Sequence, residues 1–228
     1  MSDFCLDWHR QTRIGLAEAV LCDAKSPAQI SQILTEAGAR RLLLTRLEPA
    51  KLAELAEPLR IALDYCPLSR TAIWGGAMTS SREDAIIVSA GTSDLPVARE
   101  AARTLAFYGH TAPIIADVGV AGLWRLLERL DEIRRYRLVI AVAGMEGALF
   151  SVLGGLIQAP LIAVPTSVGY GVAAGGQAAL TSALASCVAG MLAVNIDNGY
   201  GAACAALRIL GCLELLEQGG GHQPAIGP

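Results

Sequence analysis

Residues 137–171 read RLVIAVAGMEGALFSVLGGLIQAPLIAVPTSVGYG, and this stretch decides the fold. It holds two apolar runs of strand length, at residues 137–143 and 160–164, and a segment of helix length between them. The same alternation of strand and helix extends from residue 85 to residue 217. Such alternation is typical of a parallel sheet with helices on both faces, so we predict a three-layer α/β fold of the flavodoxin or Rossmann type.

The alternation predicts five strands and five helices in a domain that covers residues 81–228 and ends in a short disordered tail. The strands are expected at 85–90, 112–116, 137–143, 160–164 and 191–196. The helices are expected at 95–108, 120–134, 147–158, 175–186 and 199–217.

Residues 1–80 have a different pattern, which predicts a small α/β appendage with a linker. Ser26-Pro27 opens a helical pattern that Gly38 ends, and residues 41–45 resemble a short strand. A second helix is expected from Pro49 to Leu55. The segment WGGAMTSSR at 74–82 is rich in Gly and Ser and predicts the linker.

Residues 147–196 contain no Asp, Glu, Lys, Arg or His, although Glu146 and Asp197 bound this run. A membrane span needs about 20 largely uninterrupted apolar residues, whereas Gly, Pro and Gln residues break this run into shorter pieces. We therefore expect a soluble core and a buried active site. The segment 172–194 lacks a polar face, so we expect its own sheet and another subunit to bury it.

The composition excludes several classes of function. A net charge of −3 gives no reason to expect nucleic-acid binding. The N-terminal sequence MSDFCLDWHRQTRIG lacks the arrangement of a secretory signal, so we expect a cytoplasmic protein with reduced cysteines. The cysteines, at positions 5, 22, 66, 187, 204 and 212, form no CxxC pair or metal-binding spacing. The histidines, at 9, 110 and 222, lie in no readable catalytic motif.

In an open parallel sheet the ligand binds beyond the carboxyl ends of the strands, so the residues after each strand are candidates for the site. SAGTSD at 89–94 follows the first strand, and its backbone N–H groups and hydroxyls would hold a phosphate. The alternative is an ordinary capped turn. Asp94 would cap the helix or hold Mg²⁺. The candidates from the first two loops are Gly91, Thr92, Ser93, Asp94 and Asp117.

The later loops supply further candidates. Glu146 borders the uncharged run, where desolvation would favour a general base, although a solvated glutamate in a first helical turn is the commoner case. The loop PTSVGYG at 165–171 would wrap a ligand with Ser167 and Tyr170, or serve only as structure. Asp197 or Asn198 would cap the last helix or fix a ribose or pyridine substituent. The remaining substrate-binding candidates are Gly144, Met145 and Asn195.

Cys187 precedes the last predicted strand. A thiol in such a position is more often a buried side chain than a nucleophile, and no cationic residue near it in the sequence favours the thiolate. A positively charged substrate would supply that cation.

Taken together, SAGTSDLPVA, DVGVAG, VAGMEGAL, VPTSVGYG and VNIDNG closely resemble, in order and spacing, the LarB family of carboxylases. Weaker family features lie upstream, at Arg13, Gly15 and Glu18 and in Lys25-Ser26-Pro27. LarB starts the synthesis of the nickel-pincer cofactor of lactate racemase, and its catalytic domain is similar to PurE, the aminoimidazole-ribonucleotide carboxylase. The resemblance covers residues 85–210 and implies a PurE-like domain in a homo-oligomer, either an octamer or a smaller assembly of dimers.

The resemblance also implies a substrate and a mechanism. Nicotinic acid adenine dinucleotide would be carboxylated at C5 of its pyridinium ring, by CO₂ or bicarbonate, and cleaved at its phosphoanhydride. The products would be pyridinium-3,5-biscarboxylic acid mononucleotide and AMP. Cys187 would add at C4 to make C5 nucleophilic, Glu146 would take the C5 proton, and expulsion of the thiolate would restore aromaticity. Mg²⁺ near Asp94 would promote attack of water on the pyrophosphate.

The sequence departs from the family pattern in two places. Ala17 precedes Glu18, and Val188-Ala189-Gly190 follows Cys187, where we expect a proline in each case. Against PurE, no Ser-Ala-His-Arg segment follows the second strand, which argues against purine carboxylation. Two alternatives stay open: a PurE-like carboxylase or mutase, and a non-catalytic nucleotide-binding scaffold in which Cys187 is a core residue.

Overall fold

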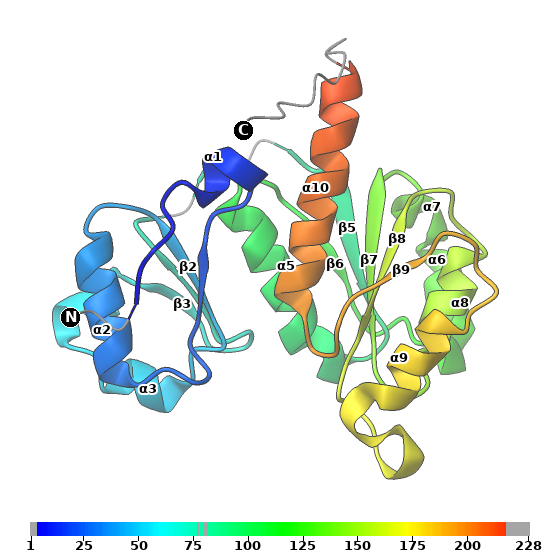
Figure 1. Cartoon of the computed structure of the whole chain (residues 1–228). Coiled ribbons are helices and arrows are strands. Elements are labelled where there is room, and N and C mark those ends of the chain that lie inside the picture. Colours follow the sequence, from blue (N-terminus) through cyan, green and yellow to red (C-terminus); the bar gives the residue numbers. More distant parts are fainter. Residues whose placement is uncertain (1–3, 77, 80–81, 218–228) are drawn as a thin grey trace.

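The computed structural model describes residues 4–76, 78–79 and 82–217, which form two sheets with their own helices (Figure 1). The predicted disordered tail lies beyond residue 217 and therefore outside the described residues. The predicted linker lies partly outside them as well. Its first residue, Trp74, is the last residue of a strand rather than part of the linker.

The N-terminal sheet has four strands in the order β1-β2-β4-β3, of which only the pair β1-β2 is parallel. Its strands are β1 (Ala19–Leu21), β2 (Leu42–Thr45), β3 (Asp64–Cys66) and β4 (Thr71–Trp74). Its helices are α1 (Arg10–Ile14), α2 (Pro27–Ala37), α3 (Pro49–Ala53) and α4 (Glu57–Ala62). The sequence predicted α2, β2 and α3 but missed the other strands, which are too short to show a period.

Helix α2 begins and ends where its sequence signals predict. The Ser26 hydroxyl accepts a hydrogen bond from the Gln29 N–H at 3.2 Å, and the Gln29 side chain accepts one from the Ser26 N–H at 3.0 Å. This reciprocal pair satisfies two of the N–H groups that a helix start leaves unbonded. Gly38 ends the helix with a positive φ of 55°, which glycine adopts at little cost.

The C-terminal sheet has five parallel strands in the order β6-β5-β7-β8-β9, which confirms the predicted α/β fold. Its strands are β5 (Ala85–Ser89), β6 (Ile114–Ile115), β7 (Leu138–Ala143), β8 (Leu161–Pro165) and β9 (Leu192–Ala193). Its α-helices are α5 (Leu95–Phe107), α6 (Leu123–Glu128), α7 (Leu130–Ile133), α8 (Ala148–Gly154), α9 (Gln177–Leu184) and α10 (Gly199–Glu217). The 3₁₀ segments are η1 (Thr92–Asp94), η2 (Val120–Gly122) and η3 (Gly171–Gly176).

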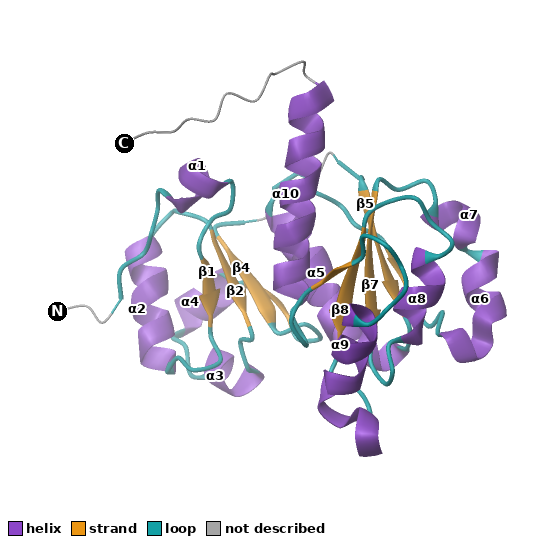
Figure 2. Ribbon diagram, turned by 45° about the vertical axis from the view of Figure 1, so that its right-hand side comes forward, coloured by secondary structure: helices purple, strands orange, loops and turns teal. Residues whose placement is uncertain are grey.

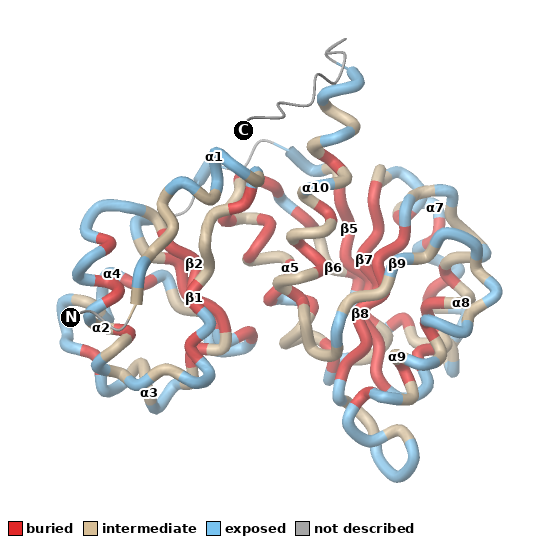
Figure 3. Tube along the Cα trace, viewed as in Figure 1, coloured by how far each residue is buried: buried red, intermediate tan, exposed pale blue. Residues whose placement is uncertain are grey.

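Helices cover both faces of this sheet and make three layers (Figure 2). Helices α5 and α10 bury one face, and α6 to α9 bury the other. Every residue of β5, β7 and β8 is buried, as the red central strands of Figure 3 show. This double burial explains why these strands are continuous apolar runs instead of alternating ones. The single helix predicted at 120–134 is instead divided into η2, α6 and α7, with the break at Arg129, where φ is −102° and ψ is 0°.

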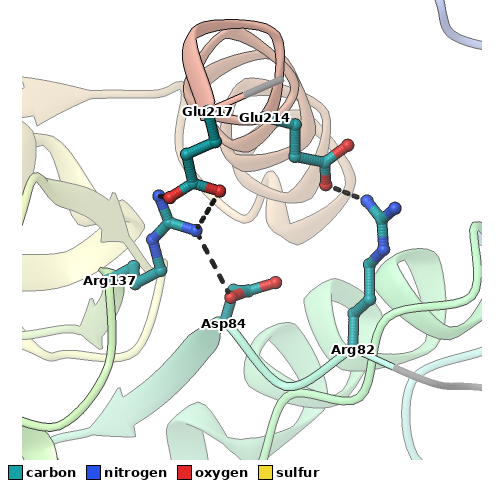
Figure 4. Close-up of polar contacts among 5 residues, drawn as sticks. All are labelled: Arg82, Asp84, Arg137, Glu214 and Glu217. Atoms are coloured by element: carbon teal, nitrogen blue, oxygen red, sulfur yellow. Dashed lines mark hydrogen bonds and ion pairs between the residues drawn. The ribbon is translucent and has the colours of Figure 1, made fainter. Parts of the chain in front are cut away.

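Helix α10 is the one helix among the described residues that is long and apolar enough to cross a membrane by length and composition. It packs on α5 and buries small residues against it and the sheet. Its last turn is charged and lies at the amino edge of the sheet, where Glu217 pairs with Arg137 at 2.7 Å and Glu214 pairs with Arg82 (Figure 4). The uncharged run at 147–196 folds into short elements, of which η3 is largely exposed and α9 is half-buried in the single chain.

Helix α5 joins the two sheets and lies between them (Figure 1). The Arg103 side chain donates to the Thr71 hydroxyl at 2.9 Å and pairs with the Asp64 carboxylate at 3.0 Å. One turn further along, at the last residue of the helix, Phe107 packs with Leu43 and Ile73 in a separate buried cluster. The N-terminal sheet is therefore fixed against the C-terminal domain through polar and apolar contacts.

A test of this packing uses the close contact between α5 and α10. A Cβ atom on Gly199 would lie 2.3 Å from the Val97 carbonyl oxygen, whereas one on Gly211 would meet nothing within 4 Å. We expect Gly199→Ala to lower the free energy of unfolding by about 1–3 kcal/mol through overpacking. Gly211→Ala should raise it by about 0.5–1 kcal/mol through helix propensity. Urea denaturation of both variants at one protein concentration measures this, and equal midpoints would contradict the packing described.

Candidate functional site

The candidate site lies at the carboxyl edge of the C-terminal sheet, where Asp94 connects several loops. Its carboxylate is buried, with Oδ2 accepting from the Gly91 N–H at 2.9 Å and Oδ1 accepting from the Thr166 hydroxyl at 2.6 Å. Gly91 follows β5 and Thr166 follows β8, so one side chain ties the loops of two strands that flank β7. Burial raises the pKa of Asp94, and the bonds from Thr166 and from the Gly91 and Gly144 N–H groups oppose that rise.

These contacts make Asp94 a structural link between loops. Each of its oxygens accepts a hydrogen bond, and burial raises the pKa of its carboxyl group. Within the described ranges, no group of three or more His, Cys, Asp or Glu side chains is placed to hold a metal ion. The structure shows Asp94 holding the loops in position, and the expected magnesium site around it stays a prediction.

A cavity of about 350 Å³, which we call the edge cavity, opens beside Asp94. It brings together six of the predicted site residues, from the loops after β5 and β7: Gly91, Ser93, Asp94, Gly144, Met145 and Glu146. The two loops therefore meet as the parallel topology requires. Its lining contains many small residues, so a planar ring has room to approach the backbone.

The loop after β7 has a constrained shape that presents Glu146. Met145 has a positive φ of 52° and Gly147 a positive φ of 65°, on either side of the glutamate. A Cβ on Gly144 would lie 2.2 Å from the Val168 carbonyl oxygen, so only glycine fits there. Glu146 is exposed at the rim of the edge cavity, and the prediction that it is buried is wrong for the single chain.

Arg125 also lines the edge cavity, and the sequence analysis missed it. It lies on α6 and forms an ion pair with Asp117, at 2.5 Å, from the loop after β6. Asp117 itself is exposed and has a positive φ of 60°. The cavity thus has a guanidinium within its wall, which suits a carboxylate or phosphate group of a ligand. Arg125 lies within a helix, eight residues after Asp117, and so outside the loops that directly follow the strands.

The other predicted residues have different places. Ser167 and Asp197 line a second cavity, of about 280 Å³, together with Ser93. Asn195 and Asn198 line a third, of about 270 Å³. The Asn198 side chain accepts from the Gly201 N–H at 2.7 Å and so caps α10. The Asp197 side chain accepts from the Ser167 N–H at 2.8 Å, which joins the loops after β8 and β9.

Three of the predicted substrate-binding residues, Thr92, Asp117 and Tyr170, are exposed and line none of these three cavities. The side chain of Tyr170 is the clearest case, since the residue is 77% exposed. In the single chain, the residues of the loop at 165–171 that line these cavities are Ser167 and Val168, not Tyr170.

Cys187 lies at the opposite edge of the sheet from Glu146. It follows the end of α9 and precedes the start of β9, which places it at the amino edge. Its neighbour Val188 contacts this edge, because a Cβ on Gly154, at the end of α8, would lie 2.6 Å from the Val188 side chain. Since β8 has five residues, the two edges are about 17 Å apart. Cys187 is exposed in the single chain, so it is not the buried core thiol that its position made the commoner case, and within one chain it does not lie beside Glu146.

Comparisons with known proteins match both halves of the chain. The family model for AIR carboxylase matches residues 84–217, and the model for the LarB/PurE-like N-terminal domain matches residues 2–75. An uncharacterized protein of Methanocaldococcus jannaschii is 47% identical over 118 residues, which are 51% of this chain and 45% of that protein. The chain thus spans less than half the length of this relative.

Two solved structures from Treponema denticola are also similar. PurE has 25% sequence identity and a TM-score of 0.45, with 56% of this chain and 80% of that chain covered. A variant of PurE2 has 19% identity and a TM-score of 0.42, with 60% and 96% covered.

The bond from Thr166 to Asp94 can be tested by Thr166→Val. We expect this variant to lower the free energy of unfolding by about 1–3 kcal/mol at pH 7, because a buried carboxylate loses a donor. The matched control is Thr104→Val, because the buried Thr104 hydroxyl has no hydrogen-bond partner among the described residues. That control should leave stability unchanged or raise it.

The effect of Thr166→Val should depend on pH. The folded-state pKa of Asp94 is raised, so the stability that its proton gives at low pH is lost as the pH rises through that pKa. Loss of the Thr166 donor raises that pKa further, so the variant should be most destabilised at pH 7 and less so at pH 4. Urea denaturation at both pH values measures this, and an equal loss at both would contradict a charged Asp94.

Proposed function

Because the chain belongs to the LarB family, with a catalytic domain of the AIR carboxylase type, we propose that it carboxylates nicotinic acid adenine dinucleotide. The reaction would add a carboxyl group at C5 of the pyridinium ring and hydrolyse the phosphoanhydride. The products would be pyridinium-3,5-biscarboxylic acid mononucleotide and AMP, for synthesis of a nickel-pincer cofactor in the cytoplasm. The observation that carries the proposal is the presence of both matched domains in one chain, with Glu146 at the rim of the edge cavity.

The chemistry needs a nucleophile and a base. A pyridinium C5 is electron-poor, so the Cys187 thiolate first adds at C4 and gives a dihydropyridine in which C5 is nucleophilic. C5 then forms a bond to the carbon of CO₂. Glu146 takes the C5 proton, and the ring nitrogen expels the thiolate from C4, which restores the aromatic ring. No cationic side chain lies near Cys187 in the sequence. The positive charge of the pyridinium ring would therefore be the cation that favours the thiolate at the start.

This mechanism requires two copies of the chain. Cys187 and Glu146 lie at opposite edges of one sheet, about 17 Å apart by the length of β8. The thiol of one subunit therefore has to enter the edge cavity of another. We accordingly propose a homo-oligomer, an octamer like PurE or a smaller assembly of dimers, with composite sites.

The metal enters the proposal only through the substrate. The described residues offer no group of three ligands, so Mg²⁺ would be bound chiefly by the phosphates of the dinucleotide. Arg125 is placed to hold an anionic group in the edge cavity without a metal. Mass spectrometry of the reaction products with and without added Mg²⁺ would measure the contribution of the metal.

The second candidate is purine carboxylation, which the AIR carboxylase match favours. The loop after β6, ADVGVAG at 116–122, contains no histidine and no Ser-Ala-His-Arg segment. Incubation with aminoimidazole ribonucleotide tests this candidate directly. We expect no carboxylation of that nucleotide.

The proposed reaction can be tested by mass spectrometry of small-molecule products. We expect the purified protein, given nicotinic acid adenine dinucleotide and ¹³C-bicarbonate, to release a labelled biscarboxylated mononucleotide and AMP. Cys187→Ala should abolish the labelled mononucleotide, because C5 is then never activated. Cys212→Ala is the control, since Cys212 is an exposed thiol on α10, remote from the edge cavity. Turnover by Cys187→Ala at the wild-type rate would remove the thiol from the mechanism.

The composite site can be tested by mixing subunits. Cys187→Ala and Glu146→Gln should each be inactive alone, because each lacks one group. When the two are unfolded together and refolded in equal amounts, about a quarter of the sites would hold both native groups, if pairing is random. Product formation at about that level supports a composite site. A mixture as inactive as its parents would contradict it.

A further inference from the structure

A cavity lies between the two sheets, directly beside the edge cavity. This interdomain cavity has a volume of about 280 Å³ and shares Ser93 and Val168 with the edge cavity. Its C-terminal wall comes from loops already assigned to the candidate site and from the first turns of α5. Its N-terminal wall is formed by residues that follow β1, β2 and β3, including Arg46 and Arg70. A ligand longer than one nucleotide can therefore extend from Glu146 past Ser93 to the N-terminal sheet.

Arg46 is the cation that this cavity leaves most available. Its Nη2 donates to the Asp197 carbonyl oxygen at 3.2 Å, and this is its one side-chain hydrogen bond within the described residues. A guanidinium carries five N–H donors, so most of its donors remain for a ligand. Arg46 is half-buried, and it also lines the third cavity, together with Asn195 and Asn198.

The carboxylates around Arg46 are mostly engaged elsewhere. Glu48 pairs with Arg70. The buried Glu100 accepts from the Tyr200 N–H at 3.2 Å, and burial raises its pKa, a rise that this hydrogen bond and the charge of Arg46 oppose. Asp197 accepts from the Ser167 N–H. These contacts leave Arg46 without a carboxylate within ion-pair distance among the described residues.

Asp23 differs from these carboxylates, because it is exposed in the cavity wall and its side chain makes no hydrogen bond in the part of the chain that the structure describes. A carboxylate is an acceptor for the hydroxyls of a ribose, and a guanidinium binds a phosphate in a bidentate manner. Arg46 and Asp23 line the same cavity without forming an ion pair. Together they offer a partner for the phosphate and a partner for the ribose of a nucleoside monophosphate.

The backbone holds the two arginines in place. Arg46 and Arg70 both have positive φ values, of 54° and 52°, and the Leu47 N–H donates to the Arg70 carbonyl at 2.7 Å. Left-handed backbone costs a residue other than glycine about 1–2 kcal/mol. Such strain is typically kept at functional sites, and the other three described non-glycine residues with positive φ are in loops at the carboxyl edge: Asp117, Met145 and Asp197.

We propose that the interdomain cavity binds the nucleoside monophosphate half of a dinucleotide substrate, with Arg46 on its phosphate. This inference rests on the proposed function for the identity of the dinucleotide, whose adenylate half would lie here. The pyridinium mononucleotide half would occupy the edge cavity beside Glu146. The N-terminal domain then selects dinucleotides over mononucleotides.

The test is equilibrium binding by calorimetry with AMP and with nicotinic acid mononucleotide as separate probes, on the full chain. The main variant is Arg46→Gly, because glycine adopts the positive φ of this position without strain and removes only the side chain. We expect its Kd for AMP to rise about 10- to 100-fold, the loss of a charged hydrogen-bonded contact. Its Kd for nicotinic acid mononucleotide should stay unchanged.

The control variant is Arg60→Gln, an exposed arginine on α4 of the same domain and outside the cavity. It should bind both probes like the wild type, and Arg46→Lys should bind AMP with intermediate affinity. AMP binding unchanged in Arg46→Gly, equal weakening of both probes, or no AMP binding by the wild type would each overturn the inference. The binding experiment involves no turnover, so its result does not depend on the outcome of the carboxylation assay.

Discussion

The site depends on one buried carboxylate. Asp94 accepts hydrogen bonds from the Gly91 N–H and the Thr166 hydroxyl, and so connects the end of β5 to the end of β8 across β7. Desolvation works against its charge, and these donors compensate for it. By joining these two loops, Asp94 fixes the shape of the edge cavity. The loop that presents Glu146 lies between the two loops that Asp94 ties.

A second constraint follows from how the two sheets are joined. Arg103 of α5 bonds to Thr71 and Asp64, so the N-terminal sheet is held along a helix whose first turn lies at the candidate site. The residues after β1 and β2 then face the loops after β5, β8 and β9. The site is in this way shared between a sheet that supplies chemistry and one that supplies charged side chains.

The sequence predicted the parallel sheet because its central strands are buried on both faces and hence continuously apolar. It also predicted the loops that meet in the edge cavity, since parallel strands bring their carboxyl ends together. It missed Arg46, which directly follows the four-residue strand β2, and Arg125, which lies inside helix α6. No local sequence pattern marks a site at either position. The error over Cys187 was avoidable: a residue between a helix and the next parallel strand lies at the amino edge.

The position of Cys187 makes subunit assembly part of the proposed chemistry. The segment from η3 to β9 is uncharged, yet much of it is exposed in the single chain, with Val172 fully exposed and Leu184 72% exposed. Apolar side chains in such a surface favour contact with another protein. The same segment carries the thiol. A contact that covers these side chains with a second copy can therefore bring Cys187 to a neighbouring edge cavity, and the nucleophile would be withheld from substrate until the oligomer has formed.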